Sequence, residues 1–327
     1  MTRMRRSRAA RRWTSPNGPH DVTRRTVPML HHHRRAVWAG LFAGIAWGLF
    51  WIPIRLVESA GLDAPWAMAV FTLVPMVFCL PVAWWLRRDY VTGGRGLIGG
   101  ILGGVAFALY SASLLYTDVV RAVLLFYLMP IWGFLLGWAI LGDRITKLRW
   151  LAIALGIIGL YVIFAGDTGL PLPRNIGDWC GLISGMFWAV GCLLILVDER
   201  VDPRIHAVNF FVVGAIISLG AAVLANANGL SVTPDWEAVQ TSVLWMIPIT
   251  LLLVLPAGFA SIYAPTKLNP GVVGLLFMLE IVVATITAAI WAGEPIGLRE
   301  YAGLALVLSA GVLEPFGALL RPRASAV

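Results

Sequence analysis

Residues 270–295, PGVVGLLFMLEIVVATITAAIWAGEP, form the stretch from which the fold can be worked out. They are apolar for more than twenty residues, which is long enough for a helix to cross a hydrocarbon layer roughly 30 Å thick. Glu280 is the only ionisable side chain inside this apolar run and lies close to its middle. Because a carboxylate at the centre of a bilayer is costly, such a residue usually faces a protein interior or a water-filled cavity. The stretch therefore predicts a membrane-spanning helix with an acidic residue on a pathway.

The chain contains a second copy of this stretch. Residues 121–145, RAVLLFYLMPIWGFLLGWAILGDRI, align with it at an offset of 151 residues. The matched positions are Phe126 with Phe277, Leu128 with Leu279, Gly142-Asp143 with Gly293-Glu294, and Ile145 with Ile296. Another motif, WxGLxxGxxW, starts at Trp38 and again at Trp179. The sequence therefore consists of two related halves, and only the second has a charge in the middle of this span.

The composition is that of a membrane protein with several spans. The 327 residues are 59% hydrophobic and 13% charged, whereas soluble domains are about 45–50% apolar and about 25% charged. The net charge of +8 comes from basic residues in an N-terminal tail and in short loops, so it does not indicate binding to nucleic acid. The three cysteines have no spacing typical of disulfides or metal sites. Because no HExxH, GxSxG, P-loop or CxxC motif occurs, the sequence predicts no enzyme, no metal site and no cofactor.

Ten apolar runs predict an all-α membrane protein with ten transmembrane helices. The runs cover residues 36–57, 65–86, 95–116, 120–141, 148–166, 177–197, 205–225, 242–263, 270–292 and 299–319. The chain then divides into a disordered basic tail, two five-helix repeats and a C-terminal tail, at residues 1–35, 36–166, 177–319 and 320–327. Because five is odd, the second repeat is inverted in the membrane relative to the first. Inverted repeats are typical of secondary transporters, whose substrate site lies near the midplane.

The distribution of lysine and arginine predicts the orientation. With the N-terminus inside, 21 of the 25 basic residues lie on the inner side and 4 on the outer side. Loops on the cytoplasmic side carry such an excess. Both termini are therefore predicted to be cytoplasmic, in a multi-pass protein of the inner (plasma) membrane.

These motifs resemble those of the EamA family in the drug/metabolite transporter superfamily, over about residues 36–320. The matching segments are Tyr127-Leu128-x-Pro130 and Gly142-Asp143-Arg144-Ile145 in the first half, and Leu279-Glu280 and Gly293-Glu294-Pro295 in the second. Ile281 stands where the family often has proline, so the usual cause of a kink beside Glu280 is missing. Asp143 also replaces the commoner glutamate.

The resemblance implies transport of small metabolites, often amino acids, by alternating access. It also implies a cavity between the first, third, fourth, sixth, eighth and ninth spans. Two alternatives stay open: transport of a nucleotide-sugar or lipid-linked solute within the same superfamily, and a non-transporting membrane scaffold or sensor. The midplane charge of Glu280 speaks against the scaffold. The expected partners are a small-molecule substrate and the lipid bilayer, and no oligomeric state is predicted.

Glu280 is the first candidate for the site. It can bind the ammonium group of a substrate, or bind and release a proton during the transport cycle. An apolar setting favours the neutral form of a carboxyl group, which is what proton coupling near neutral pH requires. The alternative is a structural carboxylate that is hydrogen-bonded to a neighbouring helix.

Aromatic residues near mid-span are the candidate lining of a cavity. Tryptophan and tyrosine usually gather at membrane interfaces, so their presence near the midplane is less expected. The candidates are Trp47, Tyr110, Tyr127, Trp132 and Trp188. Trp132 follows Met129, the repeat partner of Glu280, by three residues and so shares its face of the helix. Such rings suit stacking or cation–π contacts, and the alternative for each is plain core packing.

Charged residues near the outer ends of spans are candidate gate residues. Arg55 lies near the outer end of the first span, with Glu58 three residues on. Asp118 and Arg121 flank the outer turn between the third and fourth spans. The alternative at each place is a local ion pair at the membrane interface.

Overall fold

The structure, a computed structural model, describes residues 21–93, 97–141, 147–168, 173–197, 201–264, 268, 273, 276–294 and 296–320. Every regular element in these ranges is a helix, and no strand occurs in them. The predicted all-α class is therefore confirmed.

The described part of the first half contains eight helical elements. They are α1 (Asp21–Gly48), α2 (Trp51–Ser59), α3 (Ala64–Trp85), α4 (Arg87–Gly93), α5 (Leu97–Tyr116), α6 (Val119–Phe126), α7 (Met129–Leu141) and α8 (Lys147–Thr168). The described part of the second half contains α9 (Ile176–Val197), α10 (Pro203–Ala227), α11 (Trp236–Ile249), the π-helical segment η2 (Thr250–Val254), α12 (Leu255–Tyr263), α14 (Leu279–Thr287), the π-helical segment η4 (Ala288–Ala292) and α15 (Leu298–Leu320).

Within the described residues, six helical stretches are long and apolar enough to cross a membrane. They are Arg34–Ser59, Ala64–Trp85, Leu97–Tyr116, Ile176–Ile195, Pro203–Ala227 and Trp236–Tyr263. Shorter apolar helices occupy Val119–Gly133, Trp150–Gly159 and Leu279–Ala292, inside the predicted fourth, fifth and ninth spans. The complete set of ten spans and their inversion stay a prediction.

The first helix starts earlier than the sequence suggested. α1 begins at Asp21, so residues 21–35, which were assigned to a disordered tail, are helical. Adding residues to a helix that already exists costs much less than starting one. The polar segment therefore extends the helix that the apolar residues after it form.

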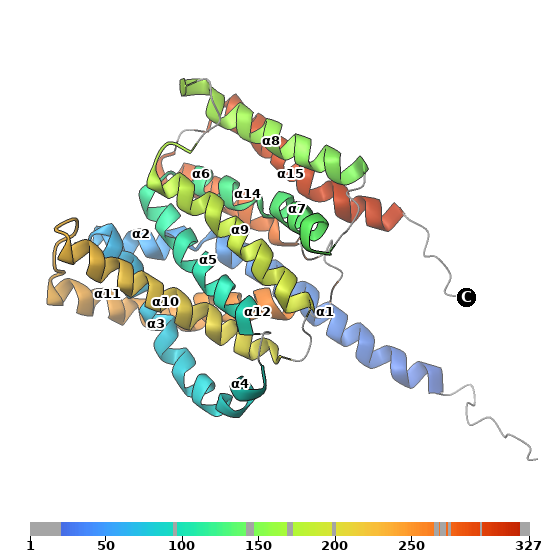
Figure 1. Ribbon diagram of the computed structural model, residues 1–327, viewed down its shortest axis with the longest axis horizontal. Coiled ribbons are helices and arrows are strands. Elements are labelled where there is room, and N and C mark those ends of the chain that lie inside the picture. The colour runs from blue at the N-terminus through green and yellow to red at the C-terminus, as the bar shows by residue number, and fades with distance from the viewer. Residues whose placement is uncertain are drawn as a thin grey trace, which may run out of the picture.

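The long helices pack side by side into one bundle (Figure 1). α5 lies between α9 and α10, and α10 also packs on α3. α8 and α15 pair with each other along one edge of the bundle. α1 packs against α12 and α14, which brings the start of the chain against the segment that carries Glu280.

Glycines let the backbones of four helices approach closely. A Cβ atom at Gly44 of α1 would lie 2.5 Å from the carbonyl oxygen of Leu276, just before α14. A Cβ at the repeat-related Gly185 of α9 would lie 2.4 Å from the carbonyl oxygen of Phe126 in α6. The first span therefore contacts the ninth in the same way that the sixth span contacts the fourth. Small residues lie at both contacts, as is usual between helices in membranes.

The two copies of the repeated stretch are interrupted at corresponding places. A turn at Tyr127-Leu128 separates α6 from α7, and a turn at Met278 precedes α14. Pro130 accounts for the first turn, because it has no N–H to donate and its ring clashes with the carbonyl of the residue four positions earlier. The second turn forms although Ile281 replaces the frequent proline, and there the N–H of Ile281 donates to the carbonyl of Met278 over 3.1 Å.

Replacing Gly44 by alanine is expected to lower the free energy of unfolding by about 1–3 kcal/mol, because the added Cβ meets backbone that cannot move aside. Thermal unfolding in detergent checks this. Gly220 of α10 is the matched control, since a Cβ there meets nothing within 4 Å. Gly220→Ala should leave the melting temperature unchanged or slightly raised, and an equal effect of both changes would contradict the close contact.

Candidate functional site

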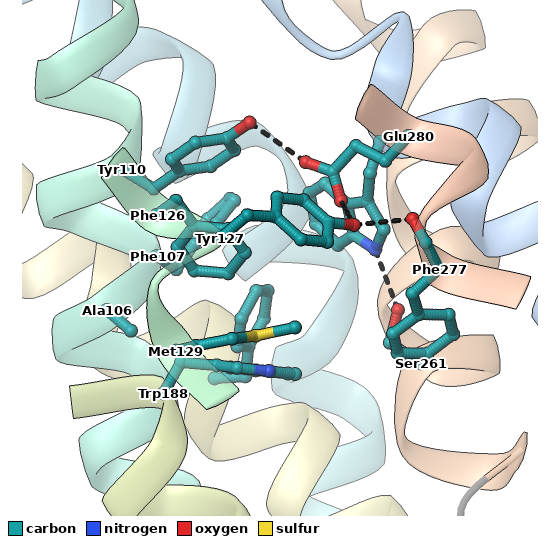
Figure 2. A pocket seen from close by; sticks show the side chains of 12 residues that line it. Ala106, Phe107, Tyr110, Phe126, Tyr127, Met129, Trp188, Ser261, Phe277 and Glu280 are labelled. Carbon is teal, nitrogen blue, oxygen red and sulfur yellow. Dashed lines mark hydrogen bonds between the residues drawn. The ribbon is translucent and has the colours of Figure 1, made fainter. Parts of the chain in front are cut away.

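A cavity of about 40 Å³ lies inside the bundle. Its lining comes from α1, α5, α9, α10, α12 and the two repeated stretches (Figure 2). The residues are Trp47, Ala106, Phe107, Tyr110, Phe126, Tyr127, Met129, Trp188, Phe210, Ser261, Phe277 and Glu280. In terms of the predicted spans these are the first, third, fourth, sixth, eighth and ninth, together with the seventh, which Phe210 adds.

Five of the six predicted substrate-binding residues line this cavity, namely Trp47, Tyr110, Tyr127, Trp188 and Glu280. Trp132 does not. Met129, at the start of α7, reaches the lining, but α7 then runs on beside α9 and α8. Trp132, about one helical turn beyond Met129, is therefore not part of the lining.

Glu280 is the polar centre of the cavity. Its side chain belongs to α14, and the residue is only 4% exposed. The hydroxyl of Tyr110 donates to Glu280 Oε1 over 2.8 Å. The hydroxyl oxygen of Tyr127 lies 2.9 Å from Glu280 Oε2. Both tyrosines come from the first half of the chain, so the contact joins the two halves.

The turn before α14 creates a further partner for Tyr127. In a regular helix the N–H of Ile281 would bond to the carbonyl of Phe277. Here it bonds to Met278 instead. The hydroxyl of Tyr127 donates to the Phe277 carbonyl oxygen over 2.5 Å and so satisfies a buried acceptor (Figure 2).

Aromatic rings form most of the remaining wall. The indole Nε1 of Trp47 donates to Ser261 Oγ over 2.7 Å, which orients the ring. Phe210 connects three other rings: its centroid lies 4.5 Å from that of Phe107 and 5.9 Å from those of Trp47 and Trp188. These are the offset and edge-to-face geometries that aromatic side chains prefer.

Seven of the lining residues are not among those predicted from the sequence. For two of them a signal was available, because Phe126 and Phe277 are repeat partners and both reach the cavity. Ser261 is a hydroxyl within an apolar span, which is a weaker signal. Phe210 has no counterpart in the repeat motifs, and only the packing of α10 against α5 brings it here.

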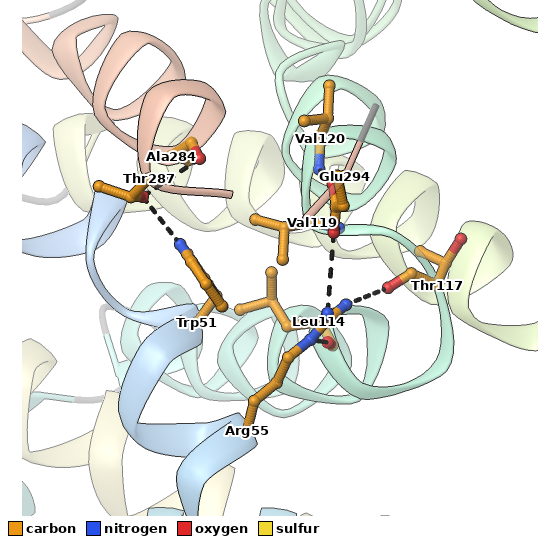
Figure 3. Close-up of polar contacts among 9 residues, drawn as sticks. All are labelled: Trp51, Arg55, Leu114, Thr117, Val119, Val120, Ala284, Thr287 and Glu294. Carbon is orange, nitrogen blue, oxygen red and sulfur yellow. Dashed lines mark hydrogen bonds and ion pairs between the residues drawn. The ribbon is translucent and has the colours of Figure 1, made fainter. Parts of the chain in front are cut away.

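Arg55 and Glu294 bind the turn between α5 and α6, at one end of the bundle (Figure 3). Arg55 donates to the carbonyl oxygens of Leu114 over 3.0 Å and Thr117 over 2.9 Å, at the end of α5. It also forms an ion pair with Glu294, with 3.7 Å between Nη1 and Oε1. The predicted gate residue thus contacts the opposite half of the chain.

Glu294 in turn caps the start of α6. Its carboxylate accepts hydrogen bonds from the backbone N–H groups of Val119 over 2.7 Å and Val120 over 3.1 Å. A carboxylate there satisfies two free donors and complements the helix dipole. Burial raises the pKa of Glu294 above its ordinary value, although Val119, Val120 and Arg55 oppose that shift.

The other two predicted gate residues differ in their surroundings. Arg121 forms an ion pair with the buried carboxylate of Asp178, at the start of α9. Thr117 donates to the same carboxylate over 2.7 Å. Asp118 is exposed and precedes α6, but its side chain makes no capping hydrogen bond there. Asp118 is the N-cap residue of α6, but the carboxylate that accepts hydrogen bonds from the first N–H groups of this helix is that of Glu294.

The geometry of this bundle can be compared with known proteins. Residues 34–165 match the EamA-like transporter family. The resemblance expected from the motifs is therefore confirmed for this part of the chain. Taken with the six long apolar helices, the EamA match supports a multi-pass membrane protein.

Relatives of the EamA-matching chain have been named but not characterised. An "uncharacterized transporter" of Archaeoglobus fulgidus is 26% identical over 255 residues, which cover 74% of this chain and 81% of the relative. Another from Pseudomonas aeruginosa is 29% identical over 135 residues, or 39% of this chain and 45% of the relative. A protein crystal structure superposes with a TM-score of 0.55 over 90% of this chain and 99% of its own, at 17% identity. That last likeness concerns the fold alone.

Replacing Glu294 by alanine is expected to lower the free energy of unfolding by about 1–2 kcal/mol, because α6 loses its cap and Arg55 its partner. Asp235→Ala is the control, since Asp235 is an acidic residue at the N-terminus of a helix, α11, where its side chain makes no capping hydrogen bond. That change should stay within about 0.5 kcal/mol. Thermal unfolding in detergent compares the two, and a Glu294 effect as small as the control would show that the cap contributes nothing.

Proposed function

We propose that this chain is a secondary transporter of the drug/metabolite type, which exports small metabolites such as amino acids by alternating access. The observation that carries the proposal is a cavity lined from both halves of the chain, with one buried carboxyl group at its centre. The family match and the names of the relatives support the same class of protein. A transporter of this kind needs no catalytic residue.

The proposed architecture is ten spans in two inverted repeats, with both termini in the cytoplasm and the protein in the inner membrane. Two structural correspondences support the repeat. Gly44 packs against the backbone of the ninth span, and the repeat-related Gly185 packs against the backbone of the fourth. The repeated stretches are also interrupted at Tyr127-Leu128 and at Met278, which are related by the offset of 151.

In this proposal the cavity is the substrate site. Trp47, Tyr110, Tyr127 and Trp188 form its walls, and Glu280 binds either the substrate or a proton. Proton coupling is favoured because the hydrogen bonds to Glu280 come from neutral hydroxyl groups, with no arginine or lysine among the lining residues to hold it ionised.

The gate lies at the turn between α5 and α6. Arg55 and Glu294 connect α2, the end of α5, the start of α6 and the segment after η4. Arg121 and Asp178 connect α6 to α9 nearby. Because each pair joins the first half of the chain to the second, separating the halves at this end must break both.

The same observations weigh against the alternatives. A nucleotide-sugar or lipid-linked sugar carries phosphate, which proteins usually bind with arginine or lysine, and neither is among the lining residues described. A scaffold or sensor has no reason to bury a carboxyl group beside two tyrosines. A solute without phosphate is therefore the better candidate.

In proteoliposomes, Glu280→Gln is expected to abolish the dependence of solute flux on a pH gradient, because the amide cannot bind and release a proton. The variant keeps the shape and one acceptor, so it should still insert. Glu237→Gln, at an exposed carboxylate, is the matched control and should behave as the unchanged protein. If flux in Glu280→Gln still follows the pH gradient, Glu280 does not couple protons.

A further inference from the structure

Two exposed tryptophans end the long apolar helix α3, and each is stacked with an arginine. Trp84 is 70% exposed and Trp85 is 66% exposed. The guanidinium of Arg87, in α4, lies over the Trp84 ring at 4.6 Å from its centroid. The guanidinium of Arg204, at the start of α10, lies over the Trp85 ring at 4.9 Å. Because tryptophan gathers where a spanning helix leaves the hydrocarbon layer, this end of α3 lies at the level of the lipid headgroups.

The short helix α4 that follows is fixed against α10. It lies at the end of α3 (Figure 1), and Leu86, Val201 and Ile205 form a small buried cluster between these elements. The hydroxyl of Tyr90 donates to Asn209 Oδ1 over 2.9 Å. Packing and a hydrogen bond therefore set the position of α4 and of the arginines at its start.

The charges on this surface are divided unevenly. Its described residues include three arginines and two aspartates. Arg204 forms an ion pair with Asp202, and Asp89 also lies close enough to Arg204 to interact with it electrostatically. Arg87 and Arg88 are exposed. The excess positive charge therefore lies at these two residues, at the start of α4.

The guanidinium of Arg87 is oriented before any ligand binds. It donates one hydrogen bond, from Nη1 to the carbonyl oxygen of Trp84 over 2.9 Å, and it is stacked on the ring of the same residue. A guanidinium has five N–H donors, so others stay available to an anion. Because the side chain is already held in place, less conformational entropy is lost when it binds.

We propose that this surface binds the headgroup of an anionic phospholipid, with the phosphate against Arg87 and Arg88 and the glycerol backbone beside Trp84. Guanidinium groups match the oxygens of a phosphate diester, and the indole ring suits the boundary between headgroup and acyl chains. A zwitterionic headgroup would bring its own ammonium group toward the two arginines, so the site favours a lipid with net negative charge. This site is separate from the cavity and does not depend on transport.

Native mass spectrometry of the purified full chain tests the lipid class. Phosphatidylglycerol should bind at least about fivefold more tightly than phosphatidylcholine with the same acyl chains, because one basic residue near the surface contributes about that factor. sn-Glycerol 3-phosphate, which has the phosphate without the chains, should not bind in the same range. It separates a lipid site from a site for a free phosphate ester.

Two pairs of variants locate the site. Arg87→Gln should weaken binding of phosphatidylglycerol about fivefold, whereas Lys147→Gln, at an exposed base at the start of α8, should change it less than about twofold. Trp84→Leu should weaken it about two- to fivefold, because the ring that orients Arg87 is lost. Trp236→Leu is its control, since Trp236 is 69% exposed at the start of α11.

Equal binding of the two lipids, or equal binding of sn-glycerol 3-phosphate, would overturn the inference. Equal losses in Arg87→Gln and Lys147→Gln would also overturn it, because the lipid would then be attracted by net charge alone. All four changes are at exposed side chains, and the comparison of lipids on the unchanged protein stands even if a variant fails to fold. An absence of transport activity would leave this binding result intact.

Discussion

The burial of one carboxyl group is the constraint on which this structure depends. A residue such as Glu280 in an apolar bundle needs hydrogen-bonding partners, because an unpaired polar group there is costly. Tyr110 and Tyr127 provide them from the first half of the chain, and a turn at Met278 supplies an acceptor for Tyr127. The interface between the halves therefore includes this group, and aromatic side chains form most of the wall around it.

The two ends of the contact between the halves have different chemistry. In the cavity the partners of Glu280 are neutral hydroxyls and rings. At the turn between α5 and α6 the contacts are ionic, and Arg55 and Glu294 also satisfy backbone groups at two helix ends. The halves are thus joined by charged contacts at this turn and by neutral hydrogen bonds in the cavity.

Much of this arrangement could be predicted from the sequence, because the internal duplication points to particular residues. The apolar runs indicate where the helices lie, and the repeat together with the midplane charge predicts that Trp47, Trp188 and Glu280 share one cavity, which they line. Contacts between distant residues were not accessible. The partner of Arg55 is Glu294 rather than a neighbour in its own helix, and nothing in the local sequence reveals it. Trp132 is not among the residues that line this cavity, because α7 continues beside α9 and α8, and helical spacing alone does not show that direction.

The close approach at Gly44 and Gly48 has a mechanical consequence. Backbone there lies directly against backbone near Leu276 and against the carbonyl of Glu280 itself, 2.9 Å from a Cβ position at Gly48. The side chains of Leu279 and Val283 face the same two glycines, so α1 and the segment that carries Glu280 are separated by only the first atoms of these side chains. Because Trp47 lies between Gly44 and Gly48 in α1, a larger residue at either glycine would push this wall of the cavity away from Glu280.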